Sequence, residues 1–448
     1  MPMRTTLLLV FIILIASVKP VFTQEIWSLQ DCIEYAMDHN LQIQKAGLNN
    51  ERNEESYRQS IRNLLPSLNA SSRFRPNFGK SIDPNTNDIV YQSFFSSSYS
   101  AGTSVSIFQG FSRVNRIAFS KILWSTGQFD EQALKAALSF QIMDAYYNVI
   151  FIKGLITISD SLLAQSQWNH NFVAGMISNG LKAESDILEV EAELASEQLR
   201  KLRALNDYDQ AVLKLKQLIN LDMGVAFEIR QVVPDLPENI NWDHSIDSLY
   251  ITALNTLPEI KSFGERVQAS IISLAMTKAN YYPSLGLYAG IGTGYYQTFL
   301  DPTGNVIPFV DQLSNNASQY LSFSMSIPLF NKGSYRSQTK LARIQLKETK
   351  LSLVQEQERV YQDIQQDWQK LLAVKMEIDQ AKIQVEAREA AEAISRRKFE
   401  KGLVNQFEYS QAKSKLAQAK SDLLNTSIQY IITRRTIDYY QGLPISGM

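Results

Sequence analysis

One stretch of the sequence limits the fold more than any other: "SSSYSAGTSVSIF", residues 96–108. Its odd positions, from Tyr99 to Ile107, are apolar or β-branched, and the positions between them are serine or glycine. A period of two predicts a β-strand, because successive side chains of a strand point to opposite faces. The polar face has no charge, although the exposed faces of soluble sheets commonly carry charged residues such as lysine. Each face of this strand therefore needs an explanation.

Three more segments, residues 67–78, 284–296 and 318–328, alternate in the same way. Each is about ten residues long, as a tilted strand must be to cross a bilayer. The predicted lipid-facing residues are Tyr99, Val105, Leu287, Ile291, Phe323 and Met325, and the predicted lumen-facing residues are Arg73, Arg75, Ser100, Ser104, Gly290, Ser322 and Ser324. A soluble sandwich is the alternative reading of the same alternation.

Four strands in one chain cannot form a closed barrel by themselves. Unpaired backbone groups in lipid cost several kcal/mol, so membrane sheets have no open edges. The smallest barrels of this kind have about eight strands. If the four segments cross a membrane, several chains must share one barrel, and three chains would supply twelve strands. Oligomerisation thus follows from hydrogen bonding.

The N-terminus resembles an export signal. Arg4 precedes an apolar run from Leu7 to Val18, and the sequence then becomes polar. We interpret residues 1–23 as a cleaved signal peptide, with an uncleaved anchor as the alternative. Cys32 is the only cysteine, which excludes an intramolecular disulfide. No later apolar run approaches the roughly 18 residues of a transmembrane helix, so we expect none after the signal peptide.

The chain repeats itself. "LLPSL" at Leu64–Leu68 is matched by "YYPSL" at Tyr281–Leu285, and "SVSIFQGFSR" at Ser104–Arg113 by "SMSIPLFNKGSYR" at Ser324–Arg336. Repeats of this kind decide the architecture. We predict a first repeat at 24–233 and a second at 244–448, joined by a linker at 234–243. Each repeat would hold a helix, two strands, a long helix and a further helix.

The long helices exceed what a strand-only pore requires. Ser334 to Phe399 contains no glycine or proline and would span about 100 Å at 1.5 Å per residue. Its apolar residues recur every seven positions with one shift of four, the pattern of a coiled coil with a stutter. The positions are Leu346, Leu353, Val360, Ile364, Leu371, Ile378 and Val385. A soluble two-stranded coiled coil fits this pattern equally well.

Several function classes lack support in the sequence. The histidines, His39, His170 and His244, have no zinc-like spacing, so no catalytic, cofactor or metal site is expected. "AGIGTG" at Ala289–Gly294 lacks the lysine and the following helix of a phosphate loop. The formal net charge of -1, without a basic block, argues against nucleic acid as a partner.

Taken together, these features resemble the TolC family of outer-membrane efflux factors. The resemblance rests on "WSLQDCIEYAMDHNLQIQ" at the start, the Pro-Ser-Leu motifs, "SMSIPLFNKGSYRSQ" before the second long helix, and the paired Gly-Leu turns. It implies a mainly α protein with membrane β: a homotrimer with a twelve-stranded barrel in outer-membrane lipid and a helical tunnel in the periplasm. It implies passive exit of drugs, metabolites or proteins, with a periplasmic adaptor (membrane fusion) protein and an inner-membrane transporter of RND, ABC or MFS type.

The resemblance also implies roles for the two helix turns. Gly180-Leu181 and Gly402-Leu403 would form periplasmic tips that meet the adaptor, although ordinary C-cap packing would also explain the leucines. The matching aperture positions are Ser185, Asp186, Phe399, Val404, Glu408 and Gln411. Phe399 and Val404 cannot form the family's polar latch, so Arg396, Arg397 or Lys401 would pair with Asp186 instead.

Two alternatives stay open at this point. An exported structural or adhesive coiled-coil protein of the periplasm or cell surface would share the signal peptide and the heptads. Arg73 and Arg75 could bias a pore toward anions, because basic rings in a pore tune selectivity. They could equally pair with Asp83 or Asp88 in the adjoining loop. The identity of the cargo is not encoded in any recognisable motif.

Overall fold

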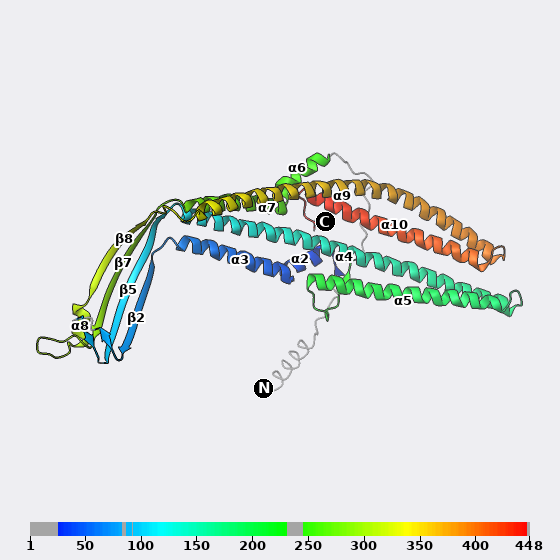
Figure 1. Cartoon of the computed structure of the whole chain (residues 1–448). Helices are drawn as coiled ribbons and strands as arrows, with labels where there is room; N and C mark the ends of the chain where they lie inside the picture. The colour runs from blue at the N-terminus through cyan, green and yellow to red at the C-terminus, as the bar shows by residue number, and fades with distance from the viewer. Residues whose placement is uncertain (1–25, 83–86, 92, 231–244, 446–448) are drawn as a thin grey trace, which may run out of the picture. The chain divides into compact units, whose positions relative to one another are not determined.

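The computed structural model describes residues 26–82, 87–91, 93–230 and 245–445 (Figure 1). The predicted signal peptide at 1–23 and the predicted linker at 234–243 lie outside these residues. The chain divides into two compact units. The first, here called the helical unit, contains the chain up to Gly47, Asp130–Ile260, and the chain from Gln357. The second, the sheet unit, contains Leu48–Phe129 and Lys261–Glu356.

The protein is mainly helical with few strands. In the first half the main elements are α2 (Leu29–His39), α3 (Leu41–Arg62), β2 (Ser67–Asn77), β5 (Phe94–Gln109), α4 (Ser112–Ser178) and α5 (Ser185–Ile219). In the second half they are α6 (Ile246–Thr256), α7 (Pro258–Ala279), β7 (Ser284–Tyr296), β8 (Ser318–Ser326), α9 (Ser334–Glu400) and α10 (Gln406–Tyr440). Corresponding helices are equally long, with 11, 22, 67 and 35 residues.

The remaining elements are short. β1 (Ile26–Trp27) pairs in parallel with β6 (Glu228–Ile229), and β3 (Ser81–Ile82) pairs with β4 (Ile89–Val90) in the loop after β2. The loop between β7 and β8 holds the seven-residue helix α8 (Phe309–Asn315), which the sequence reading did not predict. Gln312 attaches α8 to the end of β7 and to the loop. It is 1% exposed, and its side chain forms hydrogen bonds with the backbone of Tyr296 and Ile307.

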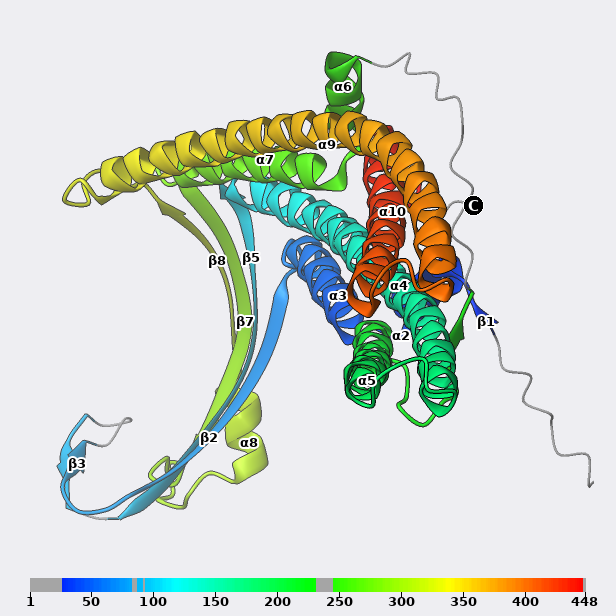
Figure 2. The same cartoon turned by 90° about the vertical axis from the view of Figure 1, so that its right-hand side faces the viewer.

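The core of the helical unit is apolar. Within it, α5 lies along the later part of α4, and α10 along the later part of α9, so each pair forms a helix hairpin (Figures 1 and 2). Four of the predicted heptad positions on α9 within this unit are 0–5% exposed, which confirms a buried seam there: Val360, Ile364, Leu371 and Ile378. Val385, the next predicted position, is only partly buried. Cys32 on α2 is fully buried in the same core. Burial raises the pKa of its thiol to about 12, so it is an inert packing residue.

One helix differs from the expectation that no later apolar run is long enough for a membrane span. α4 contains an 18-residue window with a mean hydropathy of 1.3, long and apolar enough to cross a membrane by length and composition. Part of the apolar content of α4 serves the core, because Ile142, Met143 and Val149 are fully buried there. A core helix passes the same test, so one such window is weak evidence for a membrane span.

Four strands form the sheet unit's main sheet in the order β2-β5-β7-β8, and every neighbouring pair is antiparallel (Figure 1). The register between β5 and β7 shifts between Ser106 and Phe108, where Ile107 has no partner. This β-bulge explains why Phe108 breaks the alternation of the sequence. An extra residue on one strand returns the following side chains to their faces, so that Gln109 pairs with Ser284.

Both long helices begin directly after two residues in the left-handed region. Gly110 and Phe111 have φ values of 60° and 65°, and Lys332 and Gly333 have values of 59° and 77°. Gly110 is also crowded: a Cβ there would lie 2.5 Å from the Ala279 carbonyl oxygen and 2.8 Å from Tyr282 Cβ. A Cβ at Gly333 would meet nothing within 4 Å. The two glycines therefore differ in packing while sharing the same backbone requirement.

This difference predicts unequal costs for one substitution. Gly333→Ala should lower the free energy of unfolding by about 1–2 kcal/mol, the cost of left-handed backbone for alanine. Gly110→Ala should cost about 1–3 kcal/mol more, because the added methyl overlaps backbone atoms that cannot move away freely. Thermal unfolding of the two purified variants, followed by circular dichroism, measures both values. Equal costs would contradict the close approach at Gly110.

Candidate functional site

The register of the sheet determines which side chains share a face. Residues directly opposite each other in neighbouring strands lie on the same side. Ser71, Ser100, Gly292 and Ser318 form one such row across all four strands. The predicted lumen residues all belong to this face: Arg73, Arg75, Ser100, Ser104, Gly290, Ser322 and Ser324. The predicted lipid-contacting residues all lie on the other face. Which face meets lipid stays a prediction.

The second face is apolar, and much of it is exposed in the isolated chain. Six of its large side chains are 57–79% exposed: Leu68, Phe74, Ile291, Leu321, Phe323 and Met325. The strand positions on this face include no charged residue. A soluble protein seldom leaves a continuous apolar surface of this kind open to water. This face therefore needs an apolar environment.

The only charged residues on the polar face of the four strands are Arg73 and Arg75 on β2. Both are exposed, and pairing of either with Asp88 stays a prediction. The other candidate partner, Asp83, lies outside the described residues. The fixed charge on this face of the strands is thus entirely positive.

Glycines on the polar face make room for tyrosine rings, a feature that the sequence reading missed. Tyr320 lies opposite Gly290, and a Cβ on Gly290 would lie 2.7 Å from the Tyr320 ring. The Tyr320 hydroxyl would also be 3.8 Å from a Cβ on Gly102. Tyr288 covers Gly286 in the same way, at 2.9 Å. The rings lie along the sheet over the glycines, so the predicted role of Gly290 has a steric reason.

The helix turns at the tips have one shared geometry. Gly180 and Gly402 have φ values of 72° and 71°. Each glycine N–H and the N–H of the following leucine bond back to carbonyls of the last turn, at 2.9 Å in all four cases. This is the Schellman arrangement that ends helices at glycine. Leu181 and Leu403 are nevertheless 69% and 71% exposed, so C-cap packing does not cover them.

The predicted aperture residues fall into two groups. Asp186 and Glu408 lie in the first turns of α5 and α10, where the helix dipole stabilises a carboxylate. Ser185 and Gln411 are exposed beside them. Phe399, by contrast, is 3% exposed and stacks on Tyr409 with ring centroids 5.1 Å apart.

Phe399 and Val404 therefore belong to an apolar cluster that joins the two hairpins. Val173, Val190 and Tyr409 complete its buried part. The candidate replacement Arg396 is engaged elsewhere, because it pairs with Glu400 at 3.2 Å and its guanidinium lies 4.7 Å from the Trp168 ring centroid. Among the described residues of this single chain, no ion pair joins Asp186 to Arg396, Arg397 or Lys401. Their role at an aperture stays a prediction.

A buried polar network, also missed from the sequence, lies next to this cluster. Glu193 on α5 accepts from Lys413 Nζ at 2.8 Å, from Ser410 Oγ at 3.0 Å and from the Gln406 amide, all on α10. On the α4 side, Lys413 donates to Ser166 at 3.1 Å, and Asn169 donates to Gln406 at 2.8 Å. The Lys413 side chain is 1% exposed and that of Glu193 14%. This network fixes one hairpin to the other.

The network lowers the pKa of Glu193. Burial raises this pKa, but the Lys413 ammonium and the hydrogen bonds from Lys413, Gln406 and Ser410 outweigh burial. The usual value is 4.5. A lowered pKa in the folded state gives stability that is present above pH 4.5 and is lost as the pH falls through the folded-state pKa. The hairpin contact should therefore weaken in acid.

The described residues contain no group of three or more His, Cys, Asp or Glu side chains placed to hold a metal ion. One face of the sheet is apolar, the other is small and polar, and two hairpins end in exposed leucines.

Comparison with known proteins agrees with this geometry. The model of the outer membrane efflux protein family matches residues 32–221 and 249–442. The chain therefore belongs to the outer membrane efflux protein family, whose members are outer-membrane channels with periplasmic helices. The resemblance to the TolC family found in the sequence is confirmed.

Individual relatives are distant in sequence. Alkaline protease secretion protein AprF of Pseudomonas aeruginosa is 20% identical over 347 residues, which cover 75% of this chain and 67% of that protein. A crystal structure of CusC matches with a TM-score of 0.78 at 15% identity, over 93% of this chain and 92% of that one. VceC of Vibrio cholerae matches with a TM-score of 0.77 at 15% identity, over 93% and 96%. The structural matches establish the fold.

The buried Glu193–Lys413 pair predicts that substituting Lys413 destabilises the contact between the hairpins strongly, and that substituting the exposed Lys420 does so weakly. Lys413→Met should destabilise the contact between the hairpins by about 3–5 kcal/mol, because Glu193 is left buried without its cation. Lys420→Met is the matched control on the same helix. Its pair with Glu389 is 43% and 51% exposed, so its loss should cost about 0–1 kcal/mol.

Hydrogen exchange of α5 and α10, measured from neutral pH to pH 3, tests both the pair and its acid sensitivity. Protection should fall in acid in the unmodified protein. In Glu193→Gln the pairing carboxylate is absent, so protection should already be low at neutral pH and change little in acid. Similar protection in the Lys413→Met and Lys420→Met variants would show that the network does not join the hairpins.

Proposed function

We propose that three copies of the chain form one twelve-stranded barrel that gives passive exit across the outer membrane. The observation that carries this proposal is the sheet itself: four antiparallel strands with β2 and β8 at its edges. An even number of alternating strands leaves the two edges running in opposite directions. The β8 edge of one copy can therefore pair with the β2 edge of the next in an antiparallel ladder. Closure removes the edges that lipid does not tolerate.

The apolar face is the one we assign to lipid. Besides its exposed aliphatic residues, it has an aromatic group at the end distant from α3 and α7. Phe74 contacts Phe95 and Tyr99, and Phe309 of α8 contacts Tyr99 and Tyr295, with centroids 5.3–6.3 Å apart. Membrane barrels carry aromatic residues where their outer surface crosses the membrane interface. This position supports an outward apolar face and an inward polar face.

Exposed apolar residues on the helices support assembly with further copies. In the single chain Leu351, Met376 and Ile383 of α9 are 57–72% exposed, and Leu188 and Leu202 of α5 are 66% and 58% exposed. These residues lie outside the buried seam of α9. In a homotrimer, helices of neighbouring copies would cover them, and the wall would become a continuous helical tunnel.

We further propose that the tunnel acts with a periplasmic adaptor and an inner-membrane transporter. Support comes from the two exposed leucines at equivalent turns, which offer the same small apolar contact on both hairpins. The relative AprF is named for secretion of a protein, alkaline protease, so protein cargo is one of the classes to be considered with drugs and metabolites. The aperture would be formed by Asp186, Glu408 and Gln411 at the starts of α5 and α10.

A matched pair of substitutions tests the channel. Purified protein in planar bilayers should give stable single-channel steps. Leu287→Arg on the apolar face should prevent trimer assembly, at about 2–4 kcal/mol per copy for a cation in mid-bilayer. Ser322→Arg on the polar face should leave the trimer intact and change only the conductance. A trimer that tolerates both changes equally would contradict the assignment of faces, and no conductance at all would contradict the channel.

The tip leucines are tested separately. Leu181→Asp with Leu403→Asp should abolish export from cells, because a charged tip cannot dock on an apolar adaptor surface. The trimer and its single-channel conductance should be unchanged, since both side chains are exposed in the chain itself. Ala183→Asp, an exposed change close to the first tip, is the control and should retain export. Normal export by the double leucine variant would exclude these tips as the adaptor contact.

A further inference from the structure

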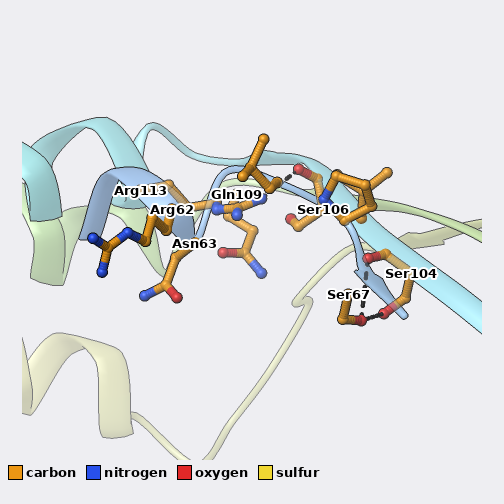
Figure 3. Close-up of a pocket in the computed structure, with 10 residues that line it drawn as sticks. Arg62, Asn63, Ser67, Ser104, Ser106, Gln109 and Arg113 are labelled. Carbon is orange, nitrogen blue, oxygen red and sulfur yellow. Dashed lines mark hydrogen bonds between the residues drawn. The ribbon is translucent and has the colours of Figure 1, made fainter. Parts of the chain in front are cut away.

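A polar pocket lies where the sheet joins the helices of the sheet unit (Figure 3). It has a volume of about 480 Å³ and forms where α3 runs into β2 and β5 runs into α4. Its polar lining consists of side chains that can donate hydrogen bonds: Arg62, Asn63, Ser67, Ser104, Ser106, Gln109 and Arg113. No carboxylate lines it. A pocket with donors and no acid is suited to an anion.

Arg113 is the central charge of this pocket. It is the second residue of α4, and no acidic residue lies in the first turn of that helix. A cation at a helix N-terminus is opposed by the helix dipole, so its position there has a cost. Its Nη1 donates to the Ser106 carbonyl at 2.6 Å, a bond that holds the guanidinium against the pocket (Figure 3). No acidic partner for Arg113 is found in the described part of the chain.

Arg62 supplies a second positive charge, and its guanidinium can leave its ion pair with Glu55. It pairs with Glu55 on its own helix, and the two side chains are 54% and 58% exposed. Exposed pairs of this kind contribute about 0–1 kcal/mol, so an anion in the pocket can compete for the guanidinium. Glu55 itself does not line the pocket. Arg62 thus lines the pocket, whereas its ion-pair partner Glu55 does not.

Neutral donors complete the wall, and the sheet positions two of them. Ser67 and Ser104 are opposite each other in β2 and β5, with their hydroxyls 2.9 Å apart. The bulge at Ile107 brings Gln109 back to the polar face, where it lines the pocket together with Asn63. Without the bulge, the alternation would place Phe108 on this face. The bulge therefore helps to create a polar pocket.

We propose that this pocket binds an oxyanion, a phosphate or carboxylate group, carried by cargo that passes along the polar face. Ser67 begins the face of β2 that continues to Arg73 and Arg75, so the charged positions on that face are all basic. The placement in the lumen rests on the proposed channel, whereas binding of an oxyanion does not. In three copies the pocket would occur three times at the same level.

Calorimetric titration of the detergent-solubilised full chain with inorganic phosphate tests the pocket. Arg113→Gln should weaken binding by about tenfold or more, since it removes a charged donor. Arg336→Gln is the matched control: Arg336 also lies in the first turn of a long helix, α9, but outside the pocket. It should leave phosphate binding unchanged. Equal loss of phosphate binding in both variants would indicate a general charge effect and would overturn the proposed binding site.

A second arm separates cargo from lipid. Micelles doped with phosphatidylglycerol should compete with phosphate no better than neutral micelles do. Binding of phosphatidylglycerol without binding of inorganic phosphate would overturn a site for cargo and assign the pocket to a lipid headgroup. A protein that conducts in bilayers but does not bind phosphate overturns only this inference. A protein that binds phosphate but does not conduct overturns only the proposed channel.

Discussion

Backbone hydrogen bonding at the edges of the four-stranded sheet governs the architecture of this protein. Every inner strand has two partners, while β2 and β8 each have one. In water an open edge is tolerable, but in lipid each unpaired group costs several kcal/mol. In the channel proposed above, the main sheet of four strands would close by pairing its edges with those of further copies of the chain. The uncharged apolar face is the surface that such a closed sheet would present to lipid.

The polar face of the sheet shows how small residues serve a passage. Serine and glycine keep side-chain volume low, and the glycines receive the rings of Tyr288 and Tyr320, which lie along the sheet. A β-carbon at Gly290 would push the Tyr320 ring off the sheet. Space is equally restricted at Gly110, where no β-carbon fits between the strand and α7. In both places glycine determines where neighbouring atoms can lie.

In the helical unit, two kinds of contact join the hairpins side by side. The apolar cluster around Phe399 excludes water, and the network around Glu193 and Lys413 satisfies charges that would otherwise be costly to bury. A buried ion pair is tolerated here because Glu193 also accepts hydrogen bonds from Gln406 and Ser410, and Lys413 also donates to Ser166. The tips beyond it keep only Schellman hydrogen bonds and exposed leucines, which leaves them available for contact.

Local patterns in the sequence determined most of the elements. Alternation in the Ser100 and Leu287 strands and the heptads through Val360 and Leu371 both follow from fixed geometric periods, so strands, long helices and the buried seam could be predicted. Glycine at 180 and 402 marked the turns because few other residues adopt positive φ. The TolC-family resemblance then suggested the channel, which periodicity alone could not do.

Tertiary structure decided what depends on the meeting of distant segments. Glu193 and Lys413 lie on separate helices, and no local pattern distinguishes them from solvated charges. The family resemblance placed Phe399 where a polar latch residue would stand, but its ring packs in a core formed by four helices. Helix α8 and the pocket around Arg113 depend on a buried glutamine and on a one-residue bulge, respectively. Periods along a chain specify which face a residue occupies, whereas its partner is chosen only when another segment packs against that face.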